Sequence, residues 1–326
     1  TGLVNGSKYN FSVSATNTLG TSNTAISNTV IPQAVWKSSI IDKNADSKYL
    51  ASGVYAGKPV IAYSDSKNGD LKLATYSGSK WSTTTVDGNQ LSIGRTNNNV
   101  SGYVSMCTSI VGKTNYLHLF YADLVDKDLR YAVYNGKYWL YEVVDGDGGA
   151  IQDYKEFPRV RGSSDVSVSN ACAVTTDGVQ VFYRDESQGI LLGAVKDKNE
   201  WRYEIVDGDK DSDERTTGDV GFHLKATTVG KKIHLIYDSV RGFDLDRNVT
   251  RGDIRYASRG SALVEDWVYK TLDVPAEGVA VAGYDVGIFN SKRGINFSWF
   301  TASGISFPNP NQLRYKNLTD TVFTDV

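Results

Sequence analysis

The chain has 326 residues, and its 35 Lys and Arg nearly balance 37 Asp and Glu, giving a formal net charge of −2 at pH 7. This balance excludes a general electrostatic attraction to nucleic acid or to an anionic membrane surface. No apolar run approaches the roughly 18 residues that a membrane-spanning helix needs. We therefore expect a globular protein with no nucleic-acid partner and no membrane span.

The amino-acid composition favours strands and turns. Gly (31 residues) and Tyr (20 residues) are frequent, and these residue types suit turns and strands. The only cysteines are Cys107 and Cys172, which excludes a disulfide-dense scaffold and a Cys-rich metal cluster. A disulfide between them and a pair of free buried thiols both remain open. The sequence contains only three histidines, and a His-based zinc site would have to use nearly all of them, so such a site is not expected. No cofactor is predicted.

Residues 1–32 are expected to form one hairpin. Apolar and polar residues alternate around Tyr9 and Phe11, a turn follows between Asn17 and Gly20, and a second alternating run comes next. The opening residues up to Tyr9, with the run to Gly20, resemble the last third of a fibronectin type III domain, including the Tyr of its tyrosine corner. A complete domain of that kind has about 100 residues. The resemblance therefore implies further domains of the same polypeptide upstream.

The rest of the chain repeats a unit of four strands. In five places a Trp is followed, after four residues, by an aliphatic residue and then Asp. Upstream of four of these motifs lies a strand such as the one from Asp128 to Ala132, and before it a strand with an aromatic residue such as Tyr121. Four short strands joined by Gly, Asp, Asn and Ser turns are typical of a β-propeller blade. The motif aspartates are Asp42, Asp87, Asp145, Asp207 and Asp273.

These repeats predict an all-β fold, a five-bladed β-propeller over residues 33–326. The fifth blade lacks a Trp-Asp strand, whereas residues 35–42 supply one before the first blade. We predict that this N-terminal strand completes the fifth blade, because joining the chain ends removes exposed sheet edges. The segment from Thr321 to Asp325 is a second candidate for that place. The predicted blades cover residues 46–87, 99–145, 165–207, 219–273 and 285–317.

The stretch from Ile61 to Lys72, with the one from Trp81 to Asp87, resembles a propeller repeat of secreted bacterial proteins of the sialidase-like and lectin-like kind. The resemblance covers residues 35–317 and implies a secreted or cell-surface location in a bacterium. The Asp-box of sialidases, Ser-x-Asp-x-Gly-x-Thr-Trp, is missing from the sequence, and no arginine triad can be placed. Sialidase activity is therefore not expected.

One face of the predicted propeller carries the long connections, at residues 88–98, 146–164, 208–218, 238–252 and 301–311. Loops held by a rigid scaffold are a common place for binding residues. Aromatic rings pack on the C–H face of a sugar, and charged groups hydrogen-bond its hydroxyls. We therefore expect this face to bind a carbohydrate or glycoprotein; a protein-interaction or adhesin surface is an alternative. The candidate residues are Tyr154, Phe157, Arg159, Arg161, Phe243, Asp246, Arg247 and Phe307.

A glycoside hydrolase or lyase acting on a polysaccharide is a further alternative, and it would need two acids beside the bond that breaks. The candidates are Asp219, Asp285 and Glu156. However, an Asp or Asn recurs before the first strand of every blade. Such repetition indicates a structural role, here as a hydrogen-bond acceptor at a turn. We therefore expect binding rather than catalysis. The recurring residues are Asp46, Asn99, Asp165, Asp219 and Asp285.

The histidines and the acidic run from Asp207 to Asp211 are further candidates for a functional role. His118 and His234 occupy equivalent places in two blades and are interpreted as strand residues, whereas His223 repeats less clearly and stays a candidate functional residue. Asp207, Asp209 and Asp211 alternate as carboxylates do in a calcium loop, but the Gly and Glu that an EF-hand needs are missing. A structural Ca²⁺ is thus an alternative to a solvated acidic turn.

Overall fold

The computed structural model describes residues 2–33, 38–89, 93–146, 164–209, 214–243, 249–261, 266–274, 285–301, 312–320 and 324–325. The chain divides into two compact units, Thr1–Ile41 and Asp42–Val326. Each unit is considered by itself.

The first unit is the hairpin that the sequence predicts. Strand β1 (Ser12–Val13) pairs with β4 (Ala25–Ile26), and β2 (Thr16–Asn17) pairs with β3 (Gly20–Thr21), all antiparallel. The turn forms because the Asn17 side chain accepts a hydrogen bond from the Leu19 amide and Gly20 takes a positive φ of 135°. Its attribution to a fibronectin type III domain stays a prediction.

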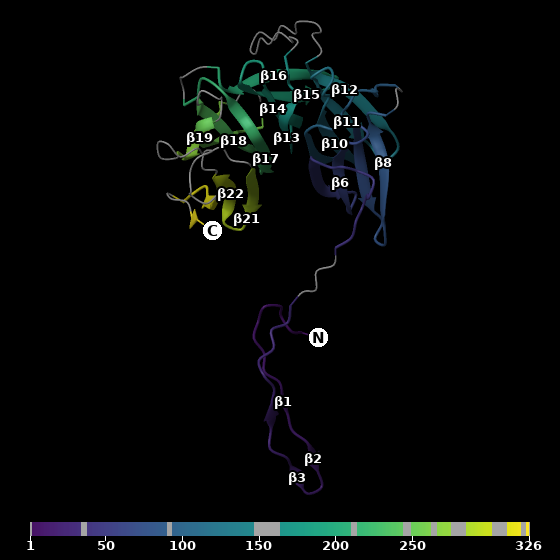
Figure 1. The fold of residues 1–326 in the computed structure, drawn as a ribbon, viewed down its shortest axis with the longest axis vertical. Helices are drawn as coiled ribbons and strands as arrows, with labels where there is room; N and C mark the ends of the chain where they lie inside the picture. The colour runs from purple at the N-terminus through teal and green to yellow at the C-terminus, as the bar shows by residue number, and fades with distance from the viewer. Residues whose placement is uncertain are drawn as a thin grey trace. The chain divides into compact units, whose positions relative to one another are not determined.

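The second unit consists of five antiparallel four-stranded sheets, each a meander in chain order (Figure 1). No helix occurs among the described residues. The all-β, five-bladed propeller is therefore confirmed. The blades are β5 (Leu50–Tyr55), β6 (Lys58–Asp65), β7 (Asp70–Tyr76) and β8 (Trp81–Asp87); β9 (Val104–Val111), β10 (Thr114–Ala122), β11 (Leu129–Tyr134) and β12 (Trp139–Asp145); β13 (Val168–Thr175), β14 (Gly178–Asp185), β15 (Ile190–Asp197) and β16 (Glu200–Asp207); β17 (Val220–Val229), β18 (Lys232–Phe243), β19 (Val249–Arg259) and β20 (Val268–Asp273); and β21 (Val286–Ser291), β22 (Gly294–Thr301), β23 (Gln312–Asn317) and β24 (Thr324–Asp325).

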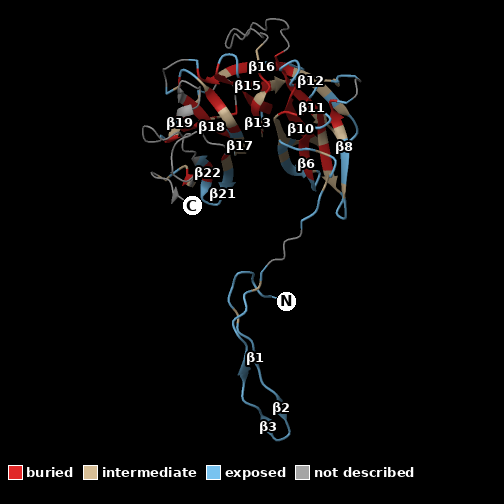
Figure 2. Ribbon diagram, in the orientation of Figure 1, coloured by how far each residue is buried: buried red, intermediate tan, exposed pale blue. Residues whose placement is uncertain are grey.

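The first strand of each blade lies innermost. β5, β9, β13, β17 and β21 pack successively on one another and line a common central cavity of about 300 Å³. Apolar residues that alternate along the middle strands are buried between neighbouring blades, as Figure 2 shows in red. Val60 and Leu73 of the first blade pack with Leu117 and Leu119 of the second, for example. Each fully buried aliphatic side chain of this kind contributes about 1.5–3 kcal/mol.

The fifth blade is completed differently from our first prediction. β24, not the segment at residues 35–42, pairs with β23, with Arg314 opposite Asp325 and Tyr315 opposite Thr324. Residues 38–41 form no strand, and 34–37 lie outside the described residues. The physical reason is chain connectivity: β24 reaches the edge of β23 through a short connection, which costs less loop-closure entropy than pairing with the distant N-terminal segment.

A disulfide joins two neighbouring blades. Cys107 on β9 and Cys172 on β13 are bonded, with their Cα atoms 6.0 Å apart. The sequence left open whether these cysteines are bridged or free, and the structure places them on adjacent inner strands.

Candidate ligand site between the third and fourth blades

The aspartate of four Trp-Asp motifs ends the last strand of one blade and links it to the next blade, whereas Asp42 precedes the first blade and binds it in the same way. In four motifs the aspartate accepts a hydrogen bond from a Tyr hydroxyl on the second strand of the following blade, and in one from an indole N–H. The bonds run from Tyr63 to Asp42 (2.8 Å), Tyr121 to Asp87 (2.6 Å), Tyr183 to Asp145 (2.7 Å), Tyr237 to Asp207 (2.7 Å) and Trp299 to Asp273 (2.9 Å). We call the boundary between two neighbouring blades a seam, and number the seams from the first and second blades onward.

Asp207 organises the third seam. Its Oδ2 accepts hydrogen bonds from Tyr237 and from Arg255 Nε (3.2 Å), and its Oδ1 accepts from the backbone N–H groups of Gly208 (2.8 Å) and Thr216 (2.7 Å). Burial raises the pKa of the Tyr237 phenol, so that it remains a neutral donor. Burial alone opposes the charge on Arg255, but Tyr237 and Asp207 raise its pKa.

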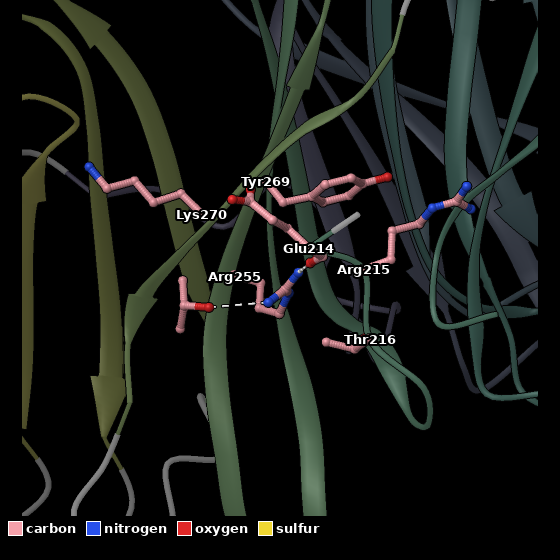
Figure 3. A pocket seen from close by; sticks show the side chains of 7 residues that line it. Glu214, Arg215, Thr216, Arg255, Tyr269 and Lys270 are labelled. Carbon is pink, nitrogen blue, oxygen red and sulfur yellow. Dashed lines mark hydrogen bonds between the residues drawn. The ribbon is translucent and has the colours of Figure 1, made fainter. Parts of the chain in front are cut away.

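A pocket of about 470 Å³ opens beside this carboxylate (Figure 3). One wall is the connection after β16, and the other is formed by β19 and β20 of the fourth blade. Arg255 crosses between the walls: its guanidinium donates to Thr271 Oγ1 (3.1 Å) and to the backbone carbonyl of Glu214. The lining residues are Glu214, Arg215, Thr216, Arg255, Tyr269, Lys270 and Thr271.

The pocket combines an aromatic surface with charged groups. The Tyr269 hydroxyl donates to the carbonyl of Val206, which fixes the ring, and the guanidinium of Arg255 lies 5.9 Å from the ring centroid. Arg215, with 21% of its side chain exposed, donates to Asp209 Oδ1 (2.8 Å), and the side chain of Glu214 is exposed. Figure 3 shows Lys270 extending away from Arg215 and Tyr269, and its ammonium donates to a carbonyl of the fifth blade.

This pocket uses one of the long connections that the sequence singled out, residues 208–218, but different side chains. Phe243 ends β18 on the described backbone, although its side chain is not described. The remaining sequence-predicted ligand residues stay predictions, because they lie outside the described residues. They are Tyr154, Phe157, Arg159, Arg161, Asp246, Arg247 and Phe307.

The acids proposed for catalysis are tied into the scaffold. Asp219 pairs with the buried Arg184 (3.1 Å), and Asp285, with 68% of its side chain exposed, pairs with Lys225 (3.4 Å). Glu156 lies outside the described residues.

The expected role of the recurring Asp and Asn side chains, as acceptors at a turn, is seen in three blades: Asn99 accepts from the Ser101 N–H (3.0 Å), Asp165 from that of Ser167 (3.1 Å) and Asp285 from that of Val286 (2.9 Å). The backbone carbonyl at all five positions also accepts an N–H from the C-terminal part of the second strand of the same blade or from the residues directly after it. The pairs are Asp46 with Ser66, Asn99 with Leu124, Asp165 with Glu186, Asp219 with Val240, and Asp285 with Phe300.

His118 and His234 lie on strands in equivalent places, as the sequence suggests, whereas His223 has different surroundings. His118 lies on β10 between Ser109 (2.8 Å) and Tyr131 (2.7 Å), and His234 bonds Tyr256 (2.7 Å) in the equivalent place on β18. His223 differs: it takes a positive φ of 49° and its Nδ1 lies 2.8 Å from Asp238 Oδ2.

The carboxylates of the possible calcium loop already have partners. Asp207 is held by five donors and Asp209 by Arg215, while Asp211 lies outside the described residues. Across the described parts of the chain, no three His, Cys, Asp or Glu residues are grouped so as to hold a metal ion. A search of the same residues for a helix long and apolar enough to cross a membrane finds none.

Sequence reasoning missed the pocket residues Arg215, Arg255 and Tyr269. A signal was available. Arg recurs at equivalent places on the third strand, two residues before a small residue or a Lys, in Arg130, Arg255 and Arg314, and a Tyr stands two residues after the motif Trp, as in Tyr141, Tyr203 and Tyr269. These residues repeat in several blades, but which of them meet across a seam depends on how the blades pack.

No family model and no curated protein matches this chain. Several solved structures are similar. Aleuria aurantia lectin in complex with alpha-methyl-L-fucoside has 14% identity and a TM-score of 0.49, covering 98% of this chain and 94% of the lectin. An exo-1,5-alpha-L-arabinanase from a bovine ruminal metagenomic library has 9% identity and a TM-score of 0.45, covering 87% and 99%. An endo-1,4-beta-xylanase from Bacteroides thetaiotaomicron has 13% identity and a TM-score of 0.45, covering 85% and 93%. At these values the similarity identifies neither a ligand nor an activity for this chain.

Proposed function

We propose that this protein binds a carbohydrate, free or carried by a glycoprotein, in the pocket of the third seam. The observation that carries the proposal is a pocket of about 470 Å³ whose lining includes the mostly buried Tyr269 ring, Arg215 and the exposed Glu214. A ring that packs on C–H groups, with charged groups that bond hydroxyls, is the usual composition of a sugar site.

The charges around the pocket favour a neutral, hydroxyl-rich ligand over a polyanion. Arg215 is matched by Asp209, and Arg255 by Asp207. The guanidinium groups therefore present oriented N–H donors without a large excess of positive charge, and their orientation is fixed before the ligand arrives.

We do not propose the hydrolase alternative, because Asp219 is engaged by Arg184 (3.1 Å), and the neighbouring acid, Glu186, pairs with the same guanidinium (2.6 Å). A protein-interaction or adhesin surface is an outcome that the test below distinguishes.

We also propose that the protein is secreted or displayed on a bacterial surface and that residues 1–32 belong to a fibronectin type III module. The Cys107–Cys172 disulfide supports an oxidising location. The exposed hairpin of the first unit supports the module assignment.

The test is a screen of immobilised glycans, followed by titration calorimetry with the methyl glycoside of the best sugar. We expect Arg215→Ala to weaken binding at this pocket at least tenfold while the fold is retained. Arg202→Ala is the matched control, because Arg202 lies on β16 of the third blade and pairs only with the exposed Asp197 among the contacts described. Sugar binding unchanged by Arg215→Ala, or no sugar binding by the intact protein, would exclude this site; release of new reducing ends would indicate a hydrolase instead.

A further inference from the structure

We propose that the first seam, between the first and second blades, holds a second ligand site with the same chemistry, so that one chain binds two sugars on the same face. This proposal rests on the proposed function of the third seam. It is carried by a set of residues that repeats in kind, in spacing and in contacts.

The spacing is identical at the two seams. Arg95 and Thr96 follow Asp87 after eight and nine residues, as Arg215 and Thr216 follow Asp207. In the first seam the facing blade supplies Arg130 and Tyr141, and in the third seam it supplies Arg255 and Tyr269, at equivalent places on the third and fourth strands.

The central carboxylate has corresponding partners at the two seams, although Arg130 Nε forms an ion pair with Asp87 where Arg255 Nε donates a hydrogen bond to Asp207. Asp87 Oδ1 accepts the Thr96 N–H at 2.8 Å, against 2.7 Å from Thr216 to Asp207. Asp87 Oδ2 lies 3.3 Å from Arg130 Nε, against 3.2 Å for Arg255 and Asp207. Each acid thus fixes both the connection after its own blade and the arginine of the next.

The groups that would meet a ligand also match. Arg130 Nη2 donates to the carbonyl of Gly94 (2.6 Å), as Arg255 does to that of Glu214. Arg95 donates to Asn89 Oδ1 (3.0 Å), as Arg215 does to Asp209.

Both aromatic walls are held by the same bond. The Tyr141 hydroxyl donates to the carbonyl of Val86 (2.9 Å), as Tyr269 donates to that of Val206. Burial raises the pKa of Tyr141 to about 12 and that of Tyr269 as well, so both phenols stay protonated donors.

The second seam shows that this arrangement is not a consequence of blade packing alone. Asp145 and Tyr203 are present there, but Leu192 stands where Arg130 and Arg255 stand in the other two blades. Among the described residues, the third strand of a blade can therefore carry a leucine at this position, so an arginine there is not required by the strand pairing.

Two differences predict unequal affinities. Gly94 replaces Glu214, both with positive φ (78° and 64°), so the first seam lacks the exposed carboxylate. A Cβ at Gly94 would lie 2.9 Å from the Tyr141 Cβ, so the backbone of this connection lies close to its aromatic wall. The neutral Asn89 replaces Asp209, and the acid nearest to Arg95 is Asp87 itself, at 3.9 Å, against 2.8 Å from Arg215 to Asp209.

The test is the stoichiometry of binding, measured by calorimetry with the methyl glycoside selected by the glycan screen. We expect two sites per chain, one site in Arg95→Ala, one site in Arg215→Ala, and none in the double variant. Arg202→Ala should keep both sites. Thermal unfolding of each variant checks the fold, and Arg95→Gln serves if Arg95→Ala unfolds.

The failure of this inference differs from the failure of the proposed function. A single site that disappears in Arg215→Ala and is unaffected by Arg95→Ala overturns the second site and leaves the third-seam site intact. Absence of binding by the intact protein, or two sites that survive in the double variant, overturns both.

Discussion

The Tyr121 hydroxyl donates a 2.6 Å hydrogen bond to Asp87 Oδ2 across the seam between the first and second blades, and both side chains are fully buried. The same carboxylate binds Arg130 and the connection that carries Arg95. One buried acid thus joins two blades and positions the residues of the candidate second site. At the first and third seams, the aspartate that joins two blades therefore also positions the candidate ligand groups.

Replacing Asp87 should be far more costly than replacing its phenol partner. Asp87→Ala leaves the buried Arg130 with only the longer ion pair to Asp123 (4.0 Å), and breaking a buried pair costs about 3–5 kcal/mol. Tyr121→Phe removes one hydrogen bond to a charged group, worth about 1.5–3 kcal/mol, and leaves Arg130 paired. Urea unfolding of both variants measures the difference, and equal losses would contradict the role assigned to the Asp87–Arg130 pair.

His118 should make stability depend on pH. Burial lowers the pKa of His118 from 6.5 to about 4, so below pH 6.5 the unfolded chain binds a proton that the folded chain does not. The stability it contributes is therefore present above pH 6.5 and is lost as pH falls toward 4, by at most roughly 3 kcal/mol.

The variant His118→Gln tests this, because Gln180 occupies the equivalent place in the third blade. We expect the unfolding free energy of the variant to fall less between pH 7 and pH 4 than that of the intact protein. The Ser109 and Tyr131 hydroxyls remain available to the new amide. Parallel pH profiles for the two proteins would show that His118 is not the titrating group.

Opening the disulfide should loosen the contact between the second and third blades. The Cys107–Cys172 bond closes a loop with a sequence separation of 65, and restricting the unfolded chain by such a loop stabilises a protein by about 2–4 kcal/mol. The double variant Cys107→Ala and Cys172→Ala should show this loss in urea. Dithiothreitol should destabilise the intact protein and leave the double variant unchanged; sensitivity of both would point to another cause.

Gly208 should tolerate a side chain less well than a glycine of similar conformation. Its φ is +103°, and a Cβ there would lie 2.8 Å from Val220 and 3.0 Å from the Ile190 backbone. Gly218 has a φ of +108° and open space around it. Both Gly→Ala changes cost about 1–3 kcal/mol in backbone strain. The additional loss of stability in Gly208→Ala, measured from the unfolding midpoints of the two variants, reports the close contacts of Gly208 at the third seam. Equal losses in the two variants would contradict this explanation.

The sequence by itself determined the architecture of this protein. The Trp-Asp motif, the alternation along each strand and the Gly-rich turns are local patterns, and their repetition revealed five blades and the shared structural role of Asp46 and its equivalents. Repetition identifies what every blade needs, because residues with the same task recur at the same place.

Only the tertiary structure decided which chain segment completes the fifth blade, that Cys107 meets Cys172, and which residues share a pocket. Glu214 and Arg255 are 41 residues apart in the chain and belong to different blades, yet their atoms are hydrogen-bonded. Contacts across a seam depend on how two sheets pack, and periodicity within one sheet carries no information about that packing. The candidate sites could therefore be located on a face from the sequence, but their residues emerged only when neighbouring blades were placed side by side.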